Sequence, residues 1–176
     1  MSDRKDYFVQ TYTGKKFYPF NPQADQIDIV DIAHSLSRIC RFGGHIEQFY
    51  SVAQHSVLVS DMVPLEYATE ALLHDASEAY IGDIVSPVKR GFPDLQTVEE
   101  SIQRVIAYKF NLDYPFSEYT KEADLLALAT EGRDLRISNS WNSDNMPTPM
   151  VAKIKPCDME TAKSMFILKA KFFGLL

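Results

Sequence analysis

The sequence has few cysteines and no long hydrophobic run. Of its 176 residues only Cys40 and Cys157 are cysteines, which is too few for a disulfide framework, and their spacing is not that of a zinc or redox motif. No stretch approaches the roughly 18 apolar residues of a membrane span, and the N-terminus lacks the apolar segment of a signal peptide. We therefore expect no membrane partner and a reducing, cytoplasmic location.

Basic residues are in the minority. The 18 lysines and arginines are outnumbered by 24 aspartates and glutamates, which gives a formal net charge of −6 at pH 7. Duplex nucleic acids bind proteins through a basic surface, so this balance argues against a duplex nucleic acid as partner. With 45% hydrophobic residues, 7 glycines and 9 prolines, the composition is that of a globular protein, and the length favours a single domain over residues 1–176.

The pattern of apolar residues predicts an all-α domain with a small β-hairpin at its N-terminus. Residues 1–24 carry β-prone residues on both sides of Thr13-Gly14, which is typical of a hairpin turn. After this segment the spacing of apolar residues becomes helical. Three expected helices matter most for function. The first begins after the N-cap Ser51, the second has Pro64 in its first turn and runs through residues 71–80 to its end at Gly82, and the third covers residues 121–135.

Four side chains of metal-ligand type stand in apolar helical surroundings. His74 and Asp75 are adjacent within the apolar run that begins at Ala71, where both side chains need polar partners if they are buried. His55 lies on the preceding expected helix and Asp124 on a later one. Two imidazoles and two carboxylates suit a divalent transition metal such as Zn, Co, Mn, Ni or Fe(II), and leave positions open for water and substrate. The alternative for the His-Asp pair alone is a helix pair whose hydrogen bonds are satisfied within the protein.

The order of these residues resembles a known signature. The chain reads YSVAQHS up to Ser56, ALLHDASEA up to Ala79, GDI up to Ile84 and KEAD up to Asp124. This ordered set resembles the H…HD…D signature of the HD-domain metal-dependent phosphohydrolases. It is most similar to their compact members that act on deoxynucleotides, the bacterial 5′-deoxynucleotidases and the small phage dATP triphosphohydrolases. The resemblance implies an HD-domain helical bundle in the cytoplasm of a bacterium or of a phage-infected cell.

The resemblance also implies roles for individual residues. It implies one metal ion held by His55, His74, Asp75 and Asp124, a catalytic acid or base at Glu78, and a further acidic site residue at Asp83. On a helix, Glu78 would share the face of the ligands. The alternatives are a solvent-facing glutamate at Glu78 and a carboxylate that caps the next turn at Asp83.

The histidines bear on the number of metal ions. The chain has four, His34, His45, His55 and His74, and none follows His74. Dinuclear members of the HD superfamily take further histidine ligands from the region between the HD pair and the last aspartate. The resemblance therefore implies a single ion, with Zn, Co or Mn as the first candidates, and argues against an oxygenase or a cyclic-dinucleotide phosphodiesterase.

Hydrolysis of a phosphate ester needs cations for the phosphate oxygens. Arg41, Lys89 and Lys121 are the candidates, because the small phage enzymes carry basic residues at comparable positions; the alternative for the two lysines is an ordinary solvated side chain. Phe42 is a candidate for stacking on the nucleobase, with a place in the core as its alternative. His45 is a candidate for the wall of the base pocket.

The function implied is hydrolysis of deoxynucleoside 5′-phosphates at the α-phosphorus by water that the metal activates. Three cations converging on the phosphates would suit a triphosphate, which favours a dATP-like dNTP triphosphohydrolase that releases deoxynucleoside and triphosphate. A 5′-deoxynucleotidase that releases phosphate from dNMPs is the alternative. A non-catalytic nucleotide-binding or scaffold protein is an alternative of another class. Relatives form dimers or larger rings, so we expect a homo-oligomer, a dimer or a hexamer.

Overall fold

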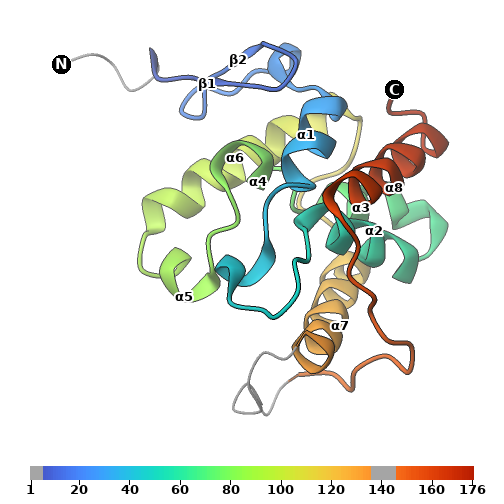
Figure 1. Cartoon of the computed structure of the whole chain (residues 1–176). Coiled ribbons are helices and arrows are strands. Elements are labelled where there is room, and N and C mark those ends of the chain that lie inside the picture. Colours follow the sequence, from blue (N-terminus) through green and yellow to red (C-terminus); the bar gives the residue numbers. More distant parts are fainter. Residues whose placement is uncertain (1–5, 136–145) are drawn as a thin grey trace.

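A computed structural model describes residues 6–135 and 146–176 of a mostly helical protein (Figure 1). Within these residues the only sheet is an antiparallel hairpin of β1 (Val9–Gln10) and β2 (Lys16–Phe17). The loop between the strands passes through Gly14 at a φ of 87°, a backbone conformation that favours glycine. The predicted helical chain with a small N-terminal hairpin is confirmed.

Eight α-helices and three short 3-10 helices make up the rest of the described secondary structure. The α-helices are α1 (Ile29–Leu36), α2 (Val52–Met62), α3 (Ala68–Leu73), α4 (Glu78–Ile81), α5 (Ser86–Lys89), α6 (Pro93–Lys109), α7 (Glu118–Asp134) and α8 (Met159–Phe172). The 3-10 helices are η2 (Ala24–Gln26), η3 (Arg41–Gly44) and η4 (Leu65–Tyr67). Figure 1 shows the hairpin at one end of the molecule, beside α1, and α7 at the opposite end.

One hydrophobic core joins most of these helices. Helices α1, α2 and α3 pack against α8, and α6 closes the core beside α3. The core includes Leu36, Val52, Leu72, Ile106 and Phe166, all without exposed surface. Burial of aliphatic and aromatic side chains of this size supplies most of the favourable free energy of folding.

Glu70 of α3 fixes the start of α7. Its Oε1 accepts hydrogen bonds from the Ser117 backbone N–H at 3.0 Å and from the Thr120 hydroxyl at 2.6 Å. His74 follows Glu70 by one helical turn and Asp124 follows Thr120 by one turn. The clamp between α3 and α7 therefore sets how His74 and Asp124 meet.

The segment with the His-Asp pair departs from the single helix expected between Pro64 and Gly82. Helix α3 ends at Leu73, residues 74–77 form tight turns, and α4 begins at Glu78. The side chain of Gln103 on α6 explains the break, because it donates to the Leu73 carbonyl at 2.8 Å and accepts from the Ser77 N–H at 3.1 Å. These are the two backbone groups that an α-helix would join to each other. The predicted end of the segment at Gly82 is confirmed.

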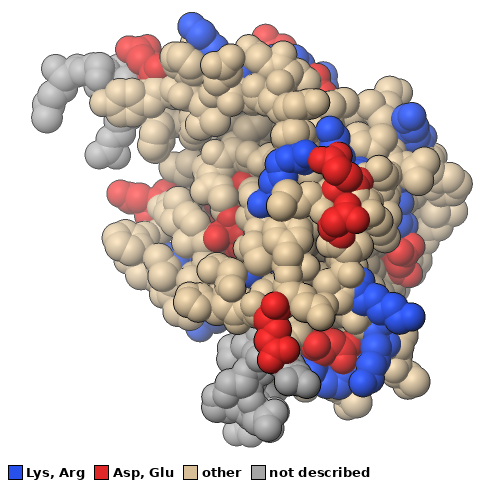
Figure 2. Space-filling model, viewed as in Figure 1, with Lys and Arg blue, Asp and Glu red and all other residues tan. Residues whose placement is uncertain are grey.

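The surface carries charges of both signs. On the face shown in Figure 2, basic and acidic side chains are interspersed rather than gathered into one field. None of the described helices combines the length and the apolar character that crossing a bilayer requires.

Candidate metal centre

Three helices bring the ligand-type side chains together. Helix α2 begins where the Ser51 hydroxyl accepts from the Gln54 N–H, as predicted, and it carries His55 into the interior without exposed surface. His74 lies at the C-terminal end of α3, with Asp75 in the turn that follows it, and Asp124 lies on α7. The centre thus forms where α2 packs against both α3 and α7.

The donor atoms of these residues lie close together. His55 Nε2 is 3.2 Å from His74 Nε2, 3.1 Å from Asp124 Oδ1 and 3.4 Å from Asp75 Oδ2. His74 Nε2 is 3.3 Å from Asp75 Oδ2 and 3.8 Å from Asp124 Oδ1. Two donors that each lie about 2.1 Å from one metal ion are separated by about 3.0–3.4 Å in octahedral or tetrahedral geometry. Four of the five distances fall in that range and the fifth, between His74 and Asp124, is 3.8 Å. His55, His74 and Asp124 form a group that could hold a metal ion.

The hydrogen bonds at the far side of each ring fix which nitrogen faces the centre. His74 Nδ1 lies 2.8 Å from the Ala71 carbonyl oxygen, which can only accept, so Nδ1 carries the proton. His55 Nδ1 lies 2.6 Å from Glu131 Oε1, and an ionised carboxylate imposes the same tautomer. In their neutral forms both rings therefore direct an Nε2 lone pair at the centre, beside two carboxylates. Four electron-rich groups at this spacing could bind a cation, and the donor set is of the type that divalent metal ions prefer.

The electrostatics of the centre follow from the same arrangement. Burial by itself would lower the pKa of His74, but Asp75 and Asp124 outweigh it, so the pKa lies well above the ordinary histidine value. Burial would raise the pKa of Asp124, but hydrogen bonds to His55 and His74 hold it well below the usual range. Protons and metal ions compete for one strongly negative centre.

A pocket of about 410 Å³ opens onto the centre. Asp75 and Asp124 form part of its wall. The other residues that line it are Arg41, Phe42, His45, Glu78, Asp83, Ile84, Val85, Ser86, Pro87, Lys89 and Leu128. Six of the eleven come from the segment 83–89, which has no buried residue and includes α5. A substrate held in this pocket would lie against the candidate ligands.

The three predicted site residues Glu78, Asp83 and Lys89, which we call the pocket rim, all line this pocket. Glu78 is buried, and its Oε2 has no hydrogen-bond partner within the described residues. Burial first, and then the nearby Asp75 and Asp83, raise the pKa of Glu78 well above the ordinary value. Burial also raises the pKa of Asp83. Lys89 Nζ lies 2.6 Å from Glu99 Oε1, and this pair is partly accessible to solvent.

The aromatic candidates also border the pocket. Phe42 has a φ of 58°, which is costly for a residue with a side chain. Its ring lies 5.3 Å from the Arg41 guanidinium. His45 is exposed and lines the same pocket. A nucleobase role for these two residues stays a prediction.

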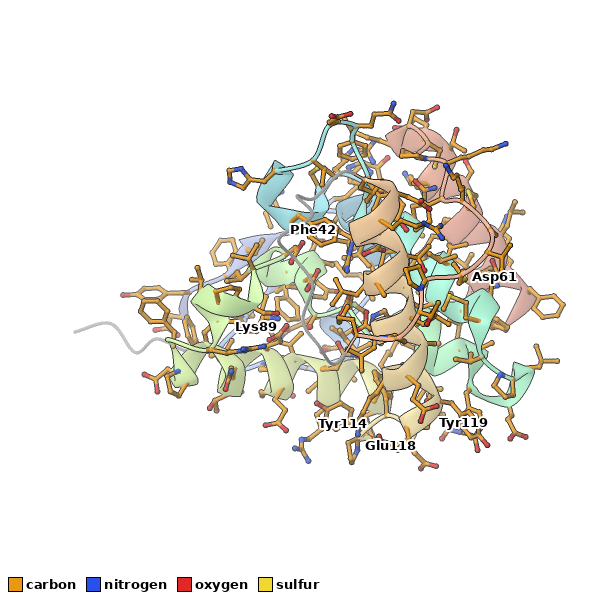
Figure 3. All side chains as sticks on the ribbon, turned by 90° about the horizontal axis from the view of Figure 1, so that it is seen from below. Phe42, Asp61, Lys89, Tyr114, Glu118 and Tyr119 are labelled. Carbon is orange, nitrogen blue, oxygen red and sulfur yellow. The ribbon has the colours of Figure 1, made fainter. Side chains whose placement is uncertain are left out.

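Lys121 does not line the pocket. Its side chain is about half exposed and pairs with Glu118. In Figure 3 Glu118 and Tyr119 lie at the start of α7, and Phe42 lies apart from them beside the other half of the helix. The structure thus separates Lys121 from the other predicted substrate residues, and a phosphate contact at this residue also stays a prediction.

Arg41 occupies a different position from the two lysines, because most of its surface is buried in the wall of the pocket. Its Nε and Nη2 donate to Glu131 Oε2 at 3.2 and 3.1 Å, and its Nη1 lies 3.4 Å from Asp75 Oδ2. Glu131 also accepts a hydrogen bond from His55. We call the three residues Arg41, His55 and Glu131 the inner network. The Arg41 guanidinium is thus already engaged by carboxylates.

Comparison with known proteins places the chain among relatives. No protein-family model matches it. It is 53% identical over 163 residues to the uncharacterized protein YfdR of Escherichia coli K12, an alignment that covers 91% of this chain and 92% of YfdR. The chain belongs to the YfdR family. It is also 27% identical over 161 residues to an uncharacterized protein of Rhodobacter capsulatus, over 80% of this chain and 81% of that protein.

In this YfdR-family chain, sequence reasoning missed Glu131. It follows Asp124 on α7 by seven residues, about two helical turns, and so lies on the same face of the helix. That spacing was a usable signal in the sequence. Burial would raise the pKa of Glu131, but the positive charges of His55 and Arg41 lower it, so the carboxylate is ionised and acts as a fixed acceptor.

Proposed function

We propose that the protein is a metal-dependent phosphohydrolase of the HD type that hydrolyses deoxynucleoside 5′-phosphates at the α-phosphorus. The observation that carries this proposal is the meeting of His55, His74, Asp75 and Asp124 at one end of a pocket, with donor atoms at the spacing of metal ligands. These four residues would hold one divalent ion, with Zn, Co or Mn as the first candidates. Bound there, the ion would supply Lewis-acid activation of the phosphate and of the attacking water.

The charges of the pocket favour a monophosphate as substrate. A triphosphate was expected on the condition that three cations converge on the phosphates. Instead Lys121 lies outside the pocket lining, which leaves Arg41 and Lys89, and the charge of Arg41 is already partly balanced by Glu131 and Asp75. The lining holds four carboxyl groups and two cations, Arg41 and Lys89. One phosphoryl group brings about −1.5 to −2 charges and a triphosphate brings more, so a dNMP suits this pocket better.

A dNTP is the second candidate substrate, because Lys89 and Arg41 both line the pocket and each could contact a different phosphate. Cleavage at the α-phosphorus would then release triphosphate rather than orthophosphate. The two substrates call for the same ligands and the same acid–base group. They differ only in the product.

Glu78 is suited to proton transfer. It is buried beside the candidate ligands, its Oε2 lacks a partner within the described residues, and burial with the nearby Asp75 and Asp83 raises its pKa well above the ordinary glutamate value, which favours a group that can both hold and release a proton. It would take a proton from the attacking water and return one to the 5′ oxygen of the leaving deoxynucleoside. Lys89 would balance charge on the phosphoryl oxygens.

A protein that only binds nucleotides would not need a group with the properties of Glu78. A buried carboxyl without a hydrogen-bond partner, next to two other carboxyl groups, is unfavourable for stability. Such groups occur where they serve a reaction. The catalytic proposal therefore ranks above a scaffold or sensor.

The test is an assay of the purified protein against all dNMPs and dNTPs, with separate detection of phosphate, pyrophosphate and triphosphate. We expect phosphate release from a dNMP that stops with a chelator and returns with Mn, Co or Zn. Asp124→Asn should abolish turnover, while Glu122→Gln, an exposed change on the same helix, should leave it intact. Turnover that persists after complete metal removal, or no turnover of any nucleotide, would overturn the proposal.

A further inference from the structure

We propose that Glu131 is a positioning residue that couples the metal centre to the phosphate-facing wall of the pocket. The inference rests on the metal site of the proposed function and goes beyond it. Glu131 does not line the pocket, so it does not touch substrate. It acts through His55, which its Oε1 contacts, and through Arg41, which its Oε2 contacts.

The first oxygen of Glu131 sets the orientation and the tautomer of the His55 ring. Glu131 Oε1 accepts the Nδ1 proton of His55 at 2.6 Å, which fixes the ring and leaves the Nε2 lone pair facing His74 and Asp124. His74 receives its support from a neutral acceptor, the Ala71 carbonyl. A charged acceptor makes the opposite nitrogen of the ring a stronger ligand. Of the two imidazoles in this centre, His55 is therefore the one whose strength as a metal ligand depends on another side chain, that of Glu131.

The second oxygen of Glu131 sets the orientation of the Arg41 guanidinium. Glu131 Oε2 accepts from both Nε and Nη2 of Arg41, which leaves Nη1 directed toward Asp75. Arg41 lines the pocket and is 8% exposed, so few other contacts can orient it. A guanidinium held in this way is oriented in advance for a phosphate oxygen.

The carboxylate of Glu131 thus supports both metal binding by His55 and phosphate binding by Arg41. The chain of contacts runs from His55 through Glu131 to Arg41, and Asp75 closes it, because Asp75 Oδ2 lies 3.4 Å from both Arg41 Nη1 and His55 Nε2. Every member except Asp75 is buried. Disturbing the oxygen that faces Arg41 will also shift the oxygen that faces His55, because both belong to one rigid group.

The variant Glu131→Gln tests this coupling without a change of size. An amide offers one acceptor oxygen, so it can serve His55 or Arg41 but not both. We expect Mn²⁺ and Zn²⁺ affinity, measured by chelator competition, to fall about 10- to 100-fold, the range for the loss of a partner of a metal-ligating histidine. In the metal-loaded protein, inorganic phosphate should also bind several-fold more weakly by calorimetry.

Two further variants separate positioning from general stability. Glu131→Asp keeps the charge and should recover part of the metal affinity. Glu122→Gln, an equivalent change on the exposed face of α7, should leave both affinities unchanged. Thermal unfolding and circular dichroism identify the folded fraction, so that affinity is compared only for folded protein.

A double-mutant cycle provides the decisive measurement. Arg41→Lys keeps a positive charge but loses the fork, and we expect it to weaken metal binding severalfold although Arg41 is not a ligand. In the Glu131→Gln background the same change should have less effect, because the connection is already broken. Strictly additive effects, or wild-type metal affinity in folded Glu131→Gln, would overturn the inference.

Failure of this inference can be told apart from failure of the proposed function. A wild-type protein that binds metal but hydrolyses no nucleotide overturns the function, while a weakened Glu131→Gln site in the same protein still supports the inference. A protein that hydrolyses nucleotides and whose Glu131→Gln variant binds metal and phosphate normally retains the function and loses the inference.

Discussion

The two buried glutamates of the site, Glu131 and Glu78, lie in opposite surroundings. Glu131 is enclosed by His55 and Arg41, and its pKa is lowered. Glu78 is buried in the pocket wall near Asp75 and Asp83, and burial together with these two carboxyl groups raises its pKa well above the usual value. Where neighbouring groups push the pKa values of two carboxyls apart, the two take different tasks. Glu131 is suited to fix the positions of His55 and Arg41, and Glu78 is suited to exchange a proton.

The same contrast separates the inner network from the pocket rim as a whole. In the inner network every charged group has an opposite partner at hydrogen-bond distance and little access to solvent. In the pocket rim the ion pair between Lys89 and Glu99 is partly exposed, and Glu78 lacks a partner for Oε2 within the described residues. Changes in the inner network should therefore affect stability and metal binding, and changes at the rim should affect turnover.

The largest expected effect is on turnover at the rim. Glu78→Gln removes the proton-transfer group and should lower kcat about 10²- to 10⁴-fold with metal affinity unchanged. The same change should raise the melting temperature, because the ionised form of Glu78 is unfavourable in the folded protein. Steady-state kinetics, chelator competition and calorimetry measure the three quantities. A variant with wild-type kcat would assign proton transfer to another group.

The next effect concerns stability in the inner network. Arg41→Ala leaves Glu131 buried without its cation and should lower the free energy of unfolding by about 3–5 kcal/mol, as for other broken buried pairs. Lys89→Ala breaks a partly exposed pair and should cost about 1 kcal/mol or less. Urea denaturation of the metal-free proteins measures both. If Arg41→Ala does not fold, Arg41→Lys gives the comparison, and equal losses at the two positions would contradict it.

These expectations depend on residues that the sequence revealed to different degrees. The hairpin followed from the local pattern of residues, the four candidate ligand residues were indicated by residue type, and their ordered set and the candidate role of Glu78 were implied by the resemblance to HD-domain proteins. Glu131 was missed because a glutamate on an exposed helix is ordinarily solvated. Its seven-residue spacing from Asp124 was a local signal, but its partner Arg41 lies 90 residues away in the chain, and a pair so distant in sequence leaves no pattern of its own.

The turn at the His-Asp pair was missed for a similar reason. Residues 71–81 have helical periodicity throughout, and no glycine or proline marks a break. The break comes from Gln103, whose side chain occupies the Leu73 carbonyl and the Ser77 N–H from another helix. A local propensity was overridden by a tertiary hydrogen bond, which sequence periodicity does not report.

The pH dependence of stability should distinguish the two glutamates by sign. Because the folded-state pKa of Glu78 is raised above its ordinary value of 4.5, its favourable contribution is complete below that value and is lost as the pH rises through the folded pKa. Because the pKa of Glu131 is lowered from 4.5, its contribution is present above that value and is lost as the pH falls through the folded pKa.

Unfolding of the metal-free protein should therefore change differently with pH in the two variants. Glu78→Gln should remove a decline in stability above pH 4.5 of at most about 1.4 kcal/mol per pH unit. Glu131→Gln should remove part of the decline in acid. Denaturation series across the pH range measure both slopes, and parallel curves for wild type and both variants would contradict the contrast.

The smallest effects concern the two lysines predicted to contact phosphate, and they test how far the rim extends. Lys89 lines the pocket and can exchange Glu99 for a phosphate oxygen, so Lys89→Met should raise KM for the nucleotide about tenfold, as for the loss of one charged hydrogen bond. Lys121 is paired with Glu118 outside the pocket, so Lys121→Met should change KM less than about twofold. Equal effects of the two substitutions would mean that the bound nucleotide reaches along α7 beyond Asp124. The longer triphosphate would then fit the site better than the monophosphate.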